Sequence, residues 1–388
     1  MKKKIAILGS TGSIGKSLIN ILKSDKKNIE IKLISANINI NELLKQTKIF
    51  NVKNIIVNDY KKFIQLKKIL HNKKINIYNN FNSIDKIFYK NKIDYSMNAI
   101  SGLNGLNPTL KIIKYSRNIA IANKESIICG WSLINKELIK NKTKFIPIDS
   151  EHYSIYSLIG GLKNHNVEEI YITASGGPFN KLPLNKFKSI KLKAALNHPN
   201  WKMGKKITID SATMMNKVFE IMEAKKIFEV DYSKLNILVH KESYVHAIVK
   251  FKNGLTKMLI HDTNMKIPIF NSLYENENKE IFSKKLDFTV INNLNFQKID
   301  FNRFPVVKIL QDLPVKNTLF ETIIVTANDD LVKMFLCGKI KFTDISRILL
   351  KVLRNKEFIK YKRIIPKNIN DILNMSNYVS LKINSLDI

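Results

Sequence analysis

Short apolar runs alternate with longer lysine-rich stretches over residues 1–150 of the chain. The runs have the length of buried strands, and the stretches between them carry apolar residues at helical spacing. Such alternation is typical of a parallel sheet covered by helices. The pattern predicts an α/β fold with a Rossmann-like doubly wound parallel sheet, whose strands we place at residues 5–8, 29–34, 54–57, 95–99, 118–122 and 144–148.

The pattern changes beyond residue 150. Residues 151–275 mix helical and strand-like segments, which predicts a second, α+β domain. Residues 276–300 are polar and irregular, as expected of a linker. Helical periodicity dominates residues 301–388, which predicts a small helical C-terminal domain. Within the second domain we expect strands at residues 167–173, 234–239, 246–252 and 255–260.

Three glycines at a spacing of three, Gly9, Gly12 and Gly15, separate the first apolar run from an amphipathic stretch. A strand, a tight turn and a helix N-terminus in this order favour a bound phosphate, because the first helical N–H groups are free. A Walker loop and the usual dinucleotide fingerprint would each need glycine where Ser10 stands. Dinucleotide binding, nucleotide hydrolysis and an ordinary turn all remain open on this motif alone.

The second predicted strand bears on which dinucleotide would bind. An NAD-binding domain usually places an acidic residue after this strand to hold the ribose 2′-hydroxyl. No acid stands there, since Glu30 lies at the start of the strand. This absence favours NADP, with Asn37 or Asn39 as candidate contacts to the 2′-phosphate.

Composition excludes several classes of protein. The formal net charge of +33 comes almost entirely from lysines that are spread over the whole chain with many Asn and Ile, so we attribute it to compositional bias and expect no specific nucleic-acid partner. The 388 residues are 45% hydrophobic, which indicates a globular protein. No apolar run approaches the ~18 residues that span a bilayer, so we expect no membrane association. The two cysteines are far apart in the chain and fit a reducing, cytoplasmic compartment.

Two acidic residues, Asp149 and Glu151, follow the last apolar run of the first domain. In an extended segment their side chains would project to the same side, where they would repel one another unless a cation joined them. Oxygen ligands of this kind suit Mg²⁺ or Mn²⁺. The alternative is a solvated helix start, with Asp149 or Ser150 as the cap.

The segment from residue 209 to 223 indicates a helix capped by Asp210 or Ser211. Asn216, Lys217 and Glu220 would then share one face. A lysine and an amide suit an anionic ligand, and the carboxylate could complete a metal site. An exposed ion pair is the alternative.

Two turn-rich segments lie between these motifs. The backbone N–H groups of the segment Ala174-Ser-Gly-Gly-Pro178 could point together at an anion. The alternative is a plain turn. The segment 197–205 holds Trp201, one of two tryptophans in the chain. An aromatic on a mobile loop suggests a flap that excludes water, whereas burial of Trp201 in the core is the alternative.

Six motifs occur together in one order: Gly9-Ser-Thr-Gly-Ser-Ile-Gly15, Ala122-Asn-Lys-Glu-Ser126, Pro147-Ile-Asp-Ser-Glu-His152, Ser175-Gly-Gly-Pro-Phe179, His198-Pro-Asn-Trp-Lys-Met-Gly204 and Asp210-Ser-Ala-Thr-Met-Met-Asn-Lys217. They closely resemble the 1-deoxy-D-xylulose 5-phosphate reductoisomerase family. The resemblance implies an NADPH- and metal-dependent oxidoreductase and isomerase, a homodimer, that converts a phosphorylated sugar, 1-deoxy-D-xylulose 5-phosphate, to 2-C-methyl-D-erythritol 4-phosphate. This reaction belongs to the methylerythritol phosphate route to isoprenoids.

The resemblance also assigns roles by motif position. The implied metal ligands are Asp149, Glu151 and Glu220, which with Lys124 form the catalytic set. The implied substrate contacts are Lys124, Ser150, Glu151, Ser175, His198, Ser211, Asn216, Lys217 and Glu220, and the implied flap residues are His198, Trp201 and Met203. The implied cofactor contacts are Thr11, Gly12, Ser13, Ile14, Asn123, Glu125 and Gly204, with Asn37, Ile38 and Asn39 in the 2′-phosphate region.

Two segments depart from the family pattern. Where the family has Ala-Gly-Lys/Arg-Asn, this chain has Ala36-Asn-Ile-Asn39, so Ile38 replaces a basic residue and weakens the expected preference for NADPH over NADH. Where the family has Gly-Thr-Pro-Asp-Met-Arg, this chain has His261-Asp-Thr-Asn-Met-Lys266. The rival functions are a simple NADP dehydrogenase acting on another phosphorylated substrate and a polyanion-binding protein without catalysis.

Overall fold

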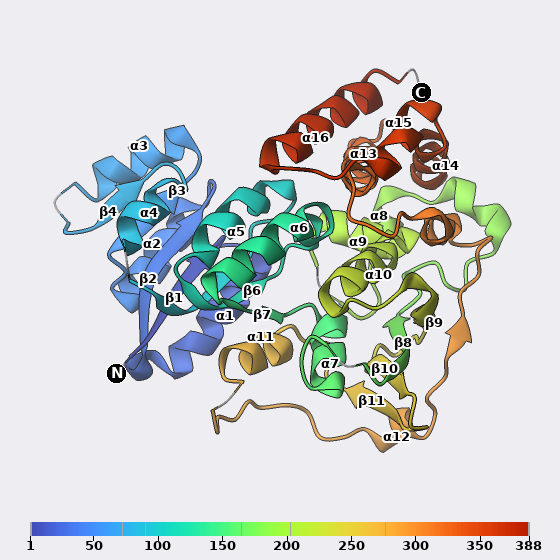
Figure 1. Ribbon diagram of the computed structural model, residues 1–388, viewed down its shortest axis with the longest axis horizontal. Helices are drawn as coiled ribbons and strands as arrows, with labels where there is room; N and C mark the ends of the chain where they lie inside the picture. Colours follow the sequence, from blue (N-terminus) through green and yellow to red (C-terminus); the bar gives the residue numbers. More distant parts are fainter. Residues whose placement is uncertain are drawn as a thin grey trace. The chain divides into compact units, whose positions relative to one another are not determined.

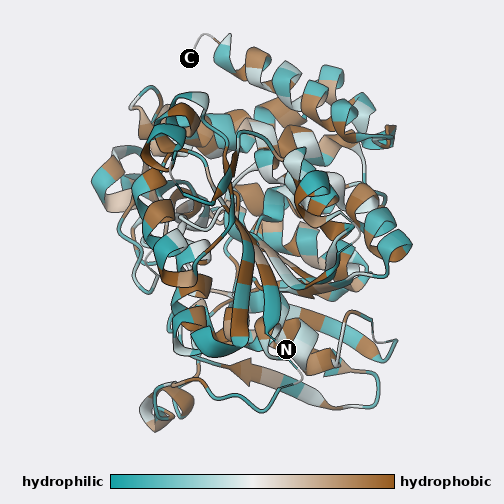
Figure 2. Ribbon diagram, turned by 90° about the vertical axis from the view of Figure 1, so that its left-hand side faces the viewer, coloured by the Kyte–Doolittle hydropathy of each residue, from teal (hydrophilic) through white to brown (hydrophobic). Residues whose placement is uncertain are grey.

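The computed structural model describes residues 2–71, 73–89, 91–163, 165–201, 203–275 and 277–386. The chain forms two compact units. The first unit comprises Met1–Ile127, Ser132–Asp149 and Met265–Ile281, and the second comprises Ile128–Trp131, Ser150–Asn264 and Phe282–Ile388. Figure 2 shows hydrophilic and hydrophobic residues mixed along the same helices, as expected of helices that bury one side.

The first unit is built on a seven-stranded sheet with the order β4-β3-β2-β1-β5-β6-β7, and all of its paired strands run parallel (Figure 1). The predicted Rossmann-like sheet is therefore confirmed. The prediction missed β4, which is only three residues long. The strands are β1 (Lys3–Leu8), β2 (Ile29–Ala36), β3 (Asn54–Val57), β4 (Asn76–Tyr78), β5 (Ile93–Asn98), β6 (Ser116–Ile121) and β7 (Lys144–Pro147), and the helices are α1 (Ser13–Ser24), α2 (Ile40–Phe50), α3 (Tyr60–Ile69), α4 (Ser83–Phe88), α5 (Leu106–Ile113), α6 (Lys124–Asn141) and α11 (Lys266–Leu273).

The glycine turn between β1 and α1 is closely packed. Gly9 has a φ of 77°, a left-handed conformation that favours glycine. A Cβ atom on Gly15 would lie 2.5 Å from the carbonyl oxygen of Gly9 and 2.6 Å from the Cα atom of Ser10. The spacing of the glycines thus lets the first turn of α1 pack directly on the end of β1.

The second unit contains a five-stranded sheet with the order β11-β10-β8-β9-β12. Strands β8 and β9 are parallel, and the other neighbours are antiparallel. The four strands predicted here are present, and β12 is an addition within the segment predicted as a linker. The elements are α7 (Ser150–Ile159), β8 (Val167–Ala174), α8 (Leu192–Ala195), α9 (Lys205–Thr213), α10 (Met215–Phe228), β9 (Leu235–Val239), β10 (Val245–Phe251), β11 (Thr256–Ile260), α12 (Phe288–Ile291) and β12 (Gln297–Lys298).

The C-terminal part of the second unit is helical, as predicted (Figure 1, red). Thr318 and Glu321 form a capping box at the start of its longest helix, α13. Among the described residues, no helix is both long enough and apolar enough to cross a membrane. The helices are α13 (Leu319–Leu336), α14 (Phe342–Leu353), α15 (Lys356–Ile359) and α16 (Ile369–Asn384).

One helix prediction was wrong. The segment predicted as a helix capped by Asp210 or Ser211 is two helices, because Met214 adopts a left-handed conformation with a φ of 71° between α9 and α10. Asp210 lies inside α9, where it accepts a hydrogen bond from Asn328 (2.8 Å) and pairs with Lys206 (2.9 Å). The predicted shared face of α10 is retained, since that helix begins before Asn216.

The close packing of the glycine turn gives a first prediction. Gly15→Ala should lower the free energy of unfolding by about 1–3 kcal/mol, because the backbone atoms around the new methyl group cannot easily move away. Gly12→Ala is the matched control, since its Cβ would lie 3.6 Å from the nearest atom, an ordinary contact. Urea unfolding checks both variants, and equal stability of the two would contradict the packing argument.

Candidate active site

The turn after β1 carries the predicted cofactor contacts Thr11, Gly12, Ser13 and Ile14. Gly12 is the N-cap residue of α1, no side chain caps this helix, and no acidic residue lies in its first turn. The positive end of the helix dipole is therefore available to an anion. The turn is held by Ser35, whose hydroxyl accepts a hydrogen bond from the Gly9 N–H group (2.9 Å). These features fit the pyrophosphate of a dinucleotide.

Other predicted cofactor contacts lie in the turns after β2 and β6. Asn37, Ile38 and Asn39 are all exposed, and the Asn39 side chain accepts a hydrogen bond from the Glu42 N–H group (3.2 Å) as the N-cap of α2. Asn123 caps α6 and donates hydrogen bonds to the carbonyl groups of Ile100 and Gly102, so it ties together the turns after β5 and β6. Glu125 lies buried in the first turn of α6.

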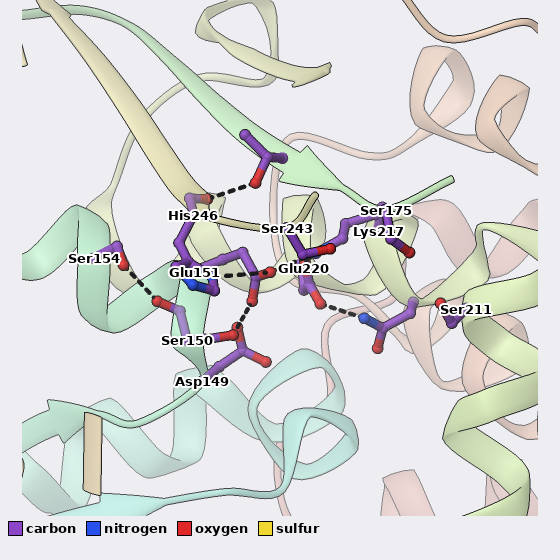
Figure 3. A network of polar contacts seen from close by, with 12 residues as sticks. Asp149, Ser150, Glu151, Ser154, Ser175, Ser211, Lys217, Glu220, Ser243 and His246 are labelled. Carbon is purple, nitrogen blue, oxygen red and sulfur yellow. Dashed lines mark hydrogen bonds and ion pairs between the residues drawn. The ribbon is translucent and has the colours of Figure 1, made fainter. Parts of the chain in front are cut away.

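Three acidic residues meet at the start of α7. This helix begins at Ser150, so Asp149 directly precedes it and Glu151 lies in its first turn. The segment is therefore helical, as in the helix-start alternative, and not extended. Asp149, Glu151 and Glu220 of α10 nevertheless each offer a carboxylate oxygen, and these oxygens lie within 4.8 Å of one another (Figure 3). A set of hard oxygen donors fits Mg²⁺ or Mn²⁺.

Two lysines pair with the three carboxylates of this group. The Lys217 ammonium lies 2.9 Å from Glu151 and 2.5 Å from Glu220, and all three side chains are buried. Asn216 also donates a hydrogen bond to Glu220. Lys124, at the start of α6, lies 3.3 Å from Asp149. The predicted face of Asn216, Lys217 and Glu220 is thus a buried network rather than an exposed ion pair.

A second cluster joins the two turn-rich segments. The Nε2 atom of His198 lies 3.2 Å from the Ser175 hydroxyl and 3.0 Å from the Ser211 hydroxyl. The Nδ1 atom of His198 accepts hydrogen bonds from the N–H groups of Asn200 (3.2 Å) and Trp201 (3.0 Å). Because Nδ1 is an acceptor, Nε2 must carry the proton and donates it toward the serines.

Two effects hold His198 neutral. Burial, followed by the charge of Lys217, lowers the pKa of His198 from 6.5 to about 4. The geometry agrees, because protonated Nδ1 would face two N–H donors. His198 is therefore a neutral hydrogen-bond donor near neutral pH. The two hydroxyl groups beside it can donate hydrogen bonds to a phosphate.

The predicted flap is partly packed. Trp201 is half-buried, and its ring meets the His246 ring edge-on at a centroid distance of 6.3 Å. Asn200 donates hydrogen bonds to the carbonyl group of Lys241 (2.6 Å) and the Ser243 hydroxyl (2.8 Å). Met203 is half-buried, and Gly204, the N-cap residue of α9, is exposed. Trp201 thus matches neither a fully exposed nor a core tryptophan.

Sequence reasoning missed His246. This residue lies on β10, and its Nδ1 atom is 3.9 Å from the Glu151 carboxylate (Figure 3). The local sequence shows only an alternating strand, so no signal in it distinguishes His246 from other strand residues. The position of His246 beside Glu151 depends on the pairing of β10 with β8 and β11.

Three models of known protein families together match most of the chain. Residues 5–130 match the model described as 1-deoxy-D-xylulose 5-phosphate reductoisomerase. Residues 145–228 match 1-deoxy-D-xylulose 5-phosphate reductoisomerase C-terminal domain, and residues 261–380 match DXP reductoisomerase C-terminal domain. A Pelagibacter ubique (strain HTCC1062) protein named 1-deoxy-D-xylulose 5-phosphate reductoisomerase is 61% identical over 387 residues, covering 100% of both chains. A Clostridium kluyveri protein of the same name is 37% identical, covering 89% of this chain and 91% of its own.

Solved structures agree with these matches. The 1-deoxy-D-xylulose 5-phosphate reductoisomerase of Zymomonas mobilis in complex with NADPH is 29% identical with a TM-score of 0.87, and the match covers 100% of both chains. A DOX-P reductoisomerase in complex with NADPH, fosmidomycin and magnesium is 28% identical with a TM-score of 0.89, covering 99% of this chain and 98% of that chain.

The neutral state of His198 predicts a pH dependence of stability. The pKa of about 4 in the folded state lies below the unfolded value of 6.5, so the unfolded chain binds more protons between these pH values. The resulting stabilisation is complete above pH 6.5 and is lost as the pH falls toward 4. His198→Asn, whose side-chain oxygen can accept the same N–H groups, should flatten the dependence of the free energy of unfolding on pH in this window.

Urea unfolding at several pH values measures this effect. His165→Asn is the control, because His165 is an exposed histidine of the same unit. The argument fails if His198→Asn loses stability on acidification as steeply as the unmodified protein.

Proposed function

The chain belongs to the 1-deoxy-D-xylulose 5-phosphate reductoisomerase family, and we propose that Asp149, Glu151 and Glu220 are the ligands of the divalent cation used in its reaction. The enzyme is an NADP-dependent oxidoreductase that converts 1-deoxy-D-xylulose 5-phosphate to 2-C-methyl-D-erythritol 4-phosphate with NADPH and a divalent metal. The meeting of the three carboxylate oxygens within 4.8 Å is the observation that carries the proposal.

The carboxylates would hold Mg²⁺ or Mn²⁺ through oxygen atoms, and Lys217 and Asn216 already orient Glu220 for this role. When bound, such a cation polarises the substrate carbonyl and stabilises the oxyanions that form as a carbon–carbon bond breaks and re-forms. Burial of Glu151 and Glu220 strengthens their attraction for a cation, because little water screens their charges. Lys124 stabilises negative charge on the substrate from its place beside Asp149.

The substrate phosphate has its own set of donors. We assign Ser175, Ser211, Asn216 and Lys217 to it, with Ser150 on the carbon skeleton. The support is the His198-centred cluster, in which a neutral imidazole donates toward two hydroxyl groups within 3.2 Å. His198, Trp201 and Met203 form the flap, which keeps the reactive aldehyde intermediate from water and from escape.

Bound NADPH would supply the hydride for the reduction. We assign its pyrophosphate to Thr11, Gly12, Ser13 and Ile14, supported by the uncapped N-terminus of α1. We add Asn123, Glu125 and Gly204 as further contacts. The loop holding Asn37, Ile38 and Asn39 faces the 2′-phosphate in this proposal. Ile38, whose side chain cannot pair with a phosphate, reduces the discrimination against NADH.

We further propose a homodimer located in the cytoplasm. Exposed apolar side chains at Phe282, Leu286 and Phe288 and the edge position of β11 offer a surface for a second copy of the chain. The exposed thiol of Cys337 suits a reducing compartment.

We assign NADPH binding to residues 1–150, metal and substrate binding to residues 151–275 with the flap at 197–205, a linker to residues 276–300 and a helical domain to residues 301–388.

The proposed ligand set is tested by Glu220→Gln. This variant should lower kcat with Mn²⁺ and NADPH by about 100-fold or more, as expected when one group that stabilises transition-state charge is lost. Glu168→Gln is the control, since Glu168 lies in the same unit and pairs with Lys250 on the protein surface.

Product analysis completes the test. The unmodified enzyme should yield the branched methylerythritol skeleton, whereas a simple dehydrogenase would leave the carbon chain unbranched. Unchanged turnover of Glu220→Gln would reject the metal assignment, and an unbranched product would reject the reaction.

A further inference from the structure

Two histidine rings stack beside the proposed metal ligands. His246 lies near the start of β10, and His261 directly follows β11. The antiparallel pairing of Val245 with Ile260 brings the two histidines together. Their ring centroids are 3.7 Å apart and their planes differ by 15°, so the rings lie face to face.

Residue 261 fixes His246 through its backbone as well. The Nε2 atom of His246 lies 3.1 Å from the carbonyl oxygen of His261. A carbonyl oxygen only accepts hydrogen bonds, so Nε2 carries a proton. When Nδ1 is protonated as well, it forms an ion pair with the Glu151 carboxylate at 3.9 Å. His246 is only 1% exposed and also meets the edge of Trp201, which restricts any alternative position of its ring.

The ring of His261 is itself held in place. Its Nδ1 atom donates a hydrogen bond to the carbonyl group of Asp262 at 2.7 Å. Burial, followed by the charge of the neighbouring His246, lowers the pKa of His261 to about 4. His261 is therefore neutral near neutral pH and stacks on His246 without charge repulsion.

The carbonyl oxygen at position 261 belongs to the backbone, whereas the stacked ring belongs to the side chain. A glycine would provide the same carbonyl oxygen but no ring. The backbone contact and the side-chain contact can therefore be tested separately. Only the ring stacking comes from the His261 side chain.

We propose that His261 is a positioning residue, whose ring stacks on His246 and holds the Nδ1 edge of His246 against Glu151, so that this carboxylate is oriented for the cation. The inference rests on the proposed role of Glu151 as a metal ligand. His261 lies behind His246 and acts on Glu151 only through it. Outer residues of this kind orient the groups that bind a metal and so set its affinity.

The test measures Mn²⁺ binding to the full-length protein by electron paramagnetic resonance, with no substrate or cofactor. His261→Leu removes the flat ring and should raise the Mn²⁺ dissociation constant about 3- to 10-fold, somewhat less than the ~10- to 100-fold typical of residues that hydrogen bond to a ligand. His261→Phe keeps a flat ring and should restore affinity to within about twofold of the unmodified protein. If the polar nitrogens of His261 were needed instead of its flat ring, Phe would not restore the affinity.

His240→Leu is the matched control, because His240 is a buried histidine of the same unit whose ring stacks on Phe296. It should leave Mn²⁺ binding unchanged, and thermal unfolding confirms that each variant is folded. Glu151→Gln should abolish tight Mn²⁺ binding. If Glu151→Gln binds Mn²⁺ as tightly as the unmodified protein, the proposed metal site is wrong. If Glu151→Gln loses binding but His261→Leu does not, or if Phe fails to rescue, the positioning role alone is overturned.

Discussion

The buried carboxylates of Glu151 and Glu220 require positive charge beside them, and much of the site is arranged around this need. Two neighbouring carboxylates repel one another strongly where water is excluded. The Lys217 ammonium lies between them and compensates one of the two charges. The Asp149 carboxylate joins the same group and is paired with Lys124. A site of this composition is suited to a divalent cation.

The fold sets this arrangement through two helix starts. Strand β7 ends directly before Asp149, and α7 begins at Ser150, so the acidic residues follow the carboxyl end of a parallel strand, where such folds bind ligands. The left-handed turn at Met214 begins a new helix just before Asn216, Lys217 and Glu220. Without this turn, α9 would continue in one direction, and Ser211 and Glu220 would not be presented by separate helices.

Much of the fold could be predicted from the sequence, because its signals are local. Continuous apolar runs located the longer parallel strands, and the glycine spacing located the turn before α1. The break at Met214 could not be predicted, since methionine seldom adopts the left-handed conformation and no glycine marks the turn. The three-residue strand β4 carries too little apolar pattern to detect. The contact between His246 and Glu151 depends on strand register, which no single segment encodes.

The central claim, that buried carboxylates create the demand for a cation, is tested most directly by Lys217→Met in urea unfolding with and without Mn²⁺. Without Mn²⁺, removal of the ammonium leaves buried carboxylates uncompensated and should lower the free energy of unfolding by on the order of 3 kcal/mol. Saturating Mn²⁺ should stabilise this variant more than it stabilises the unmodified protein. A Lys217→Met protein that is as stable as the unmodified protein in the absence of Mn²⁺, and gains no more from Mn²⁺, would contradict the account.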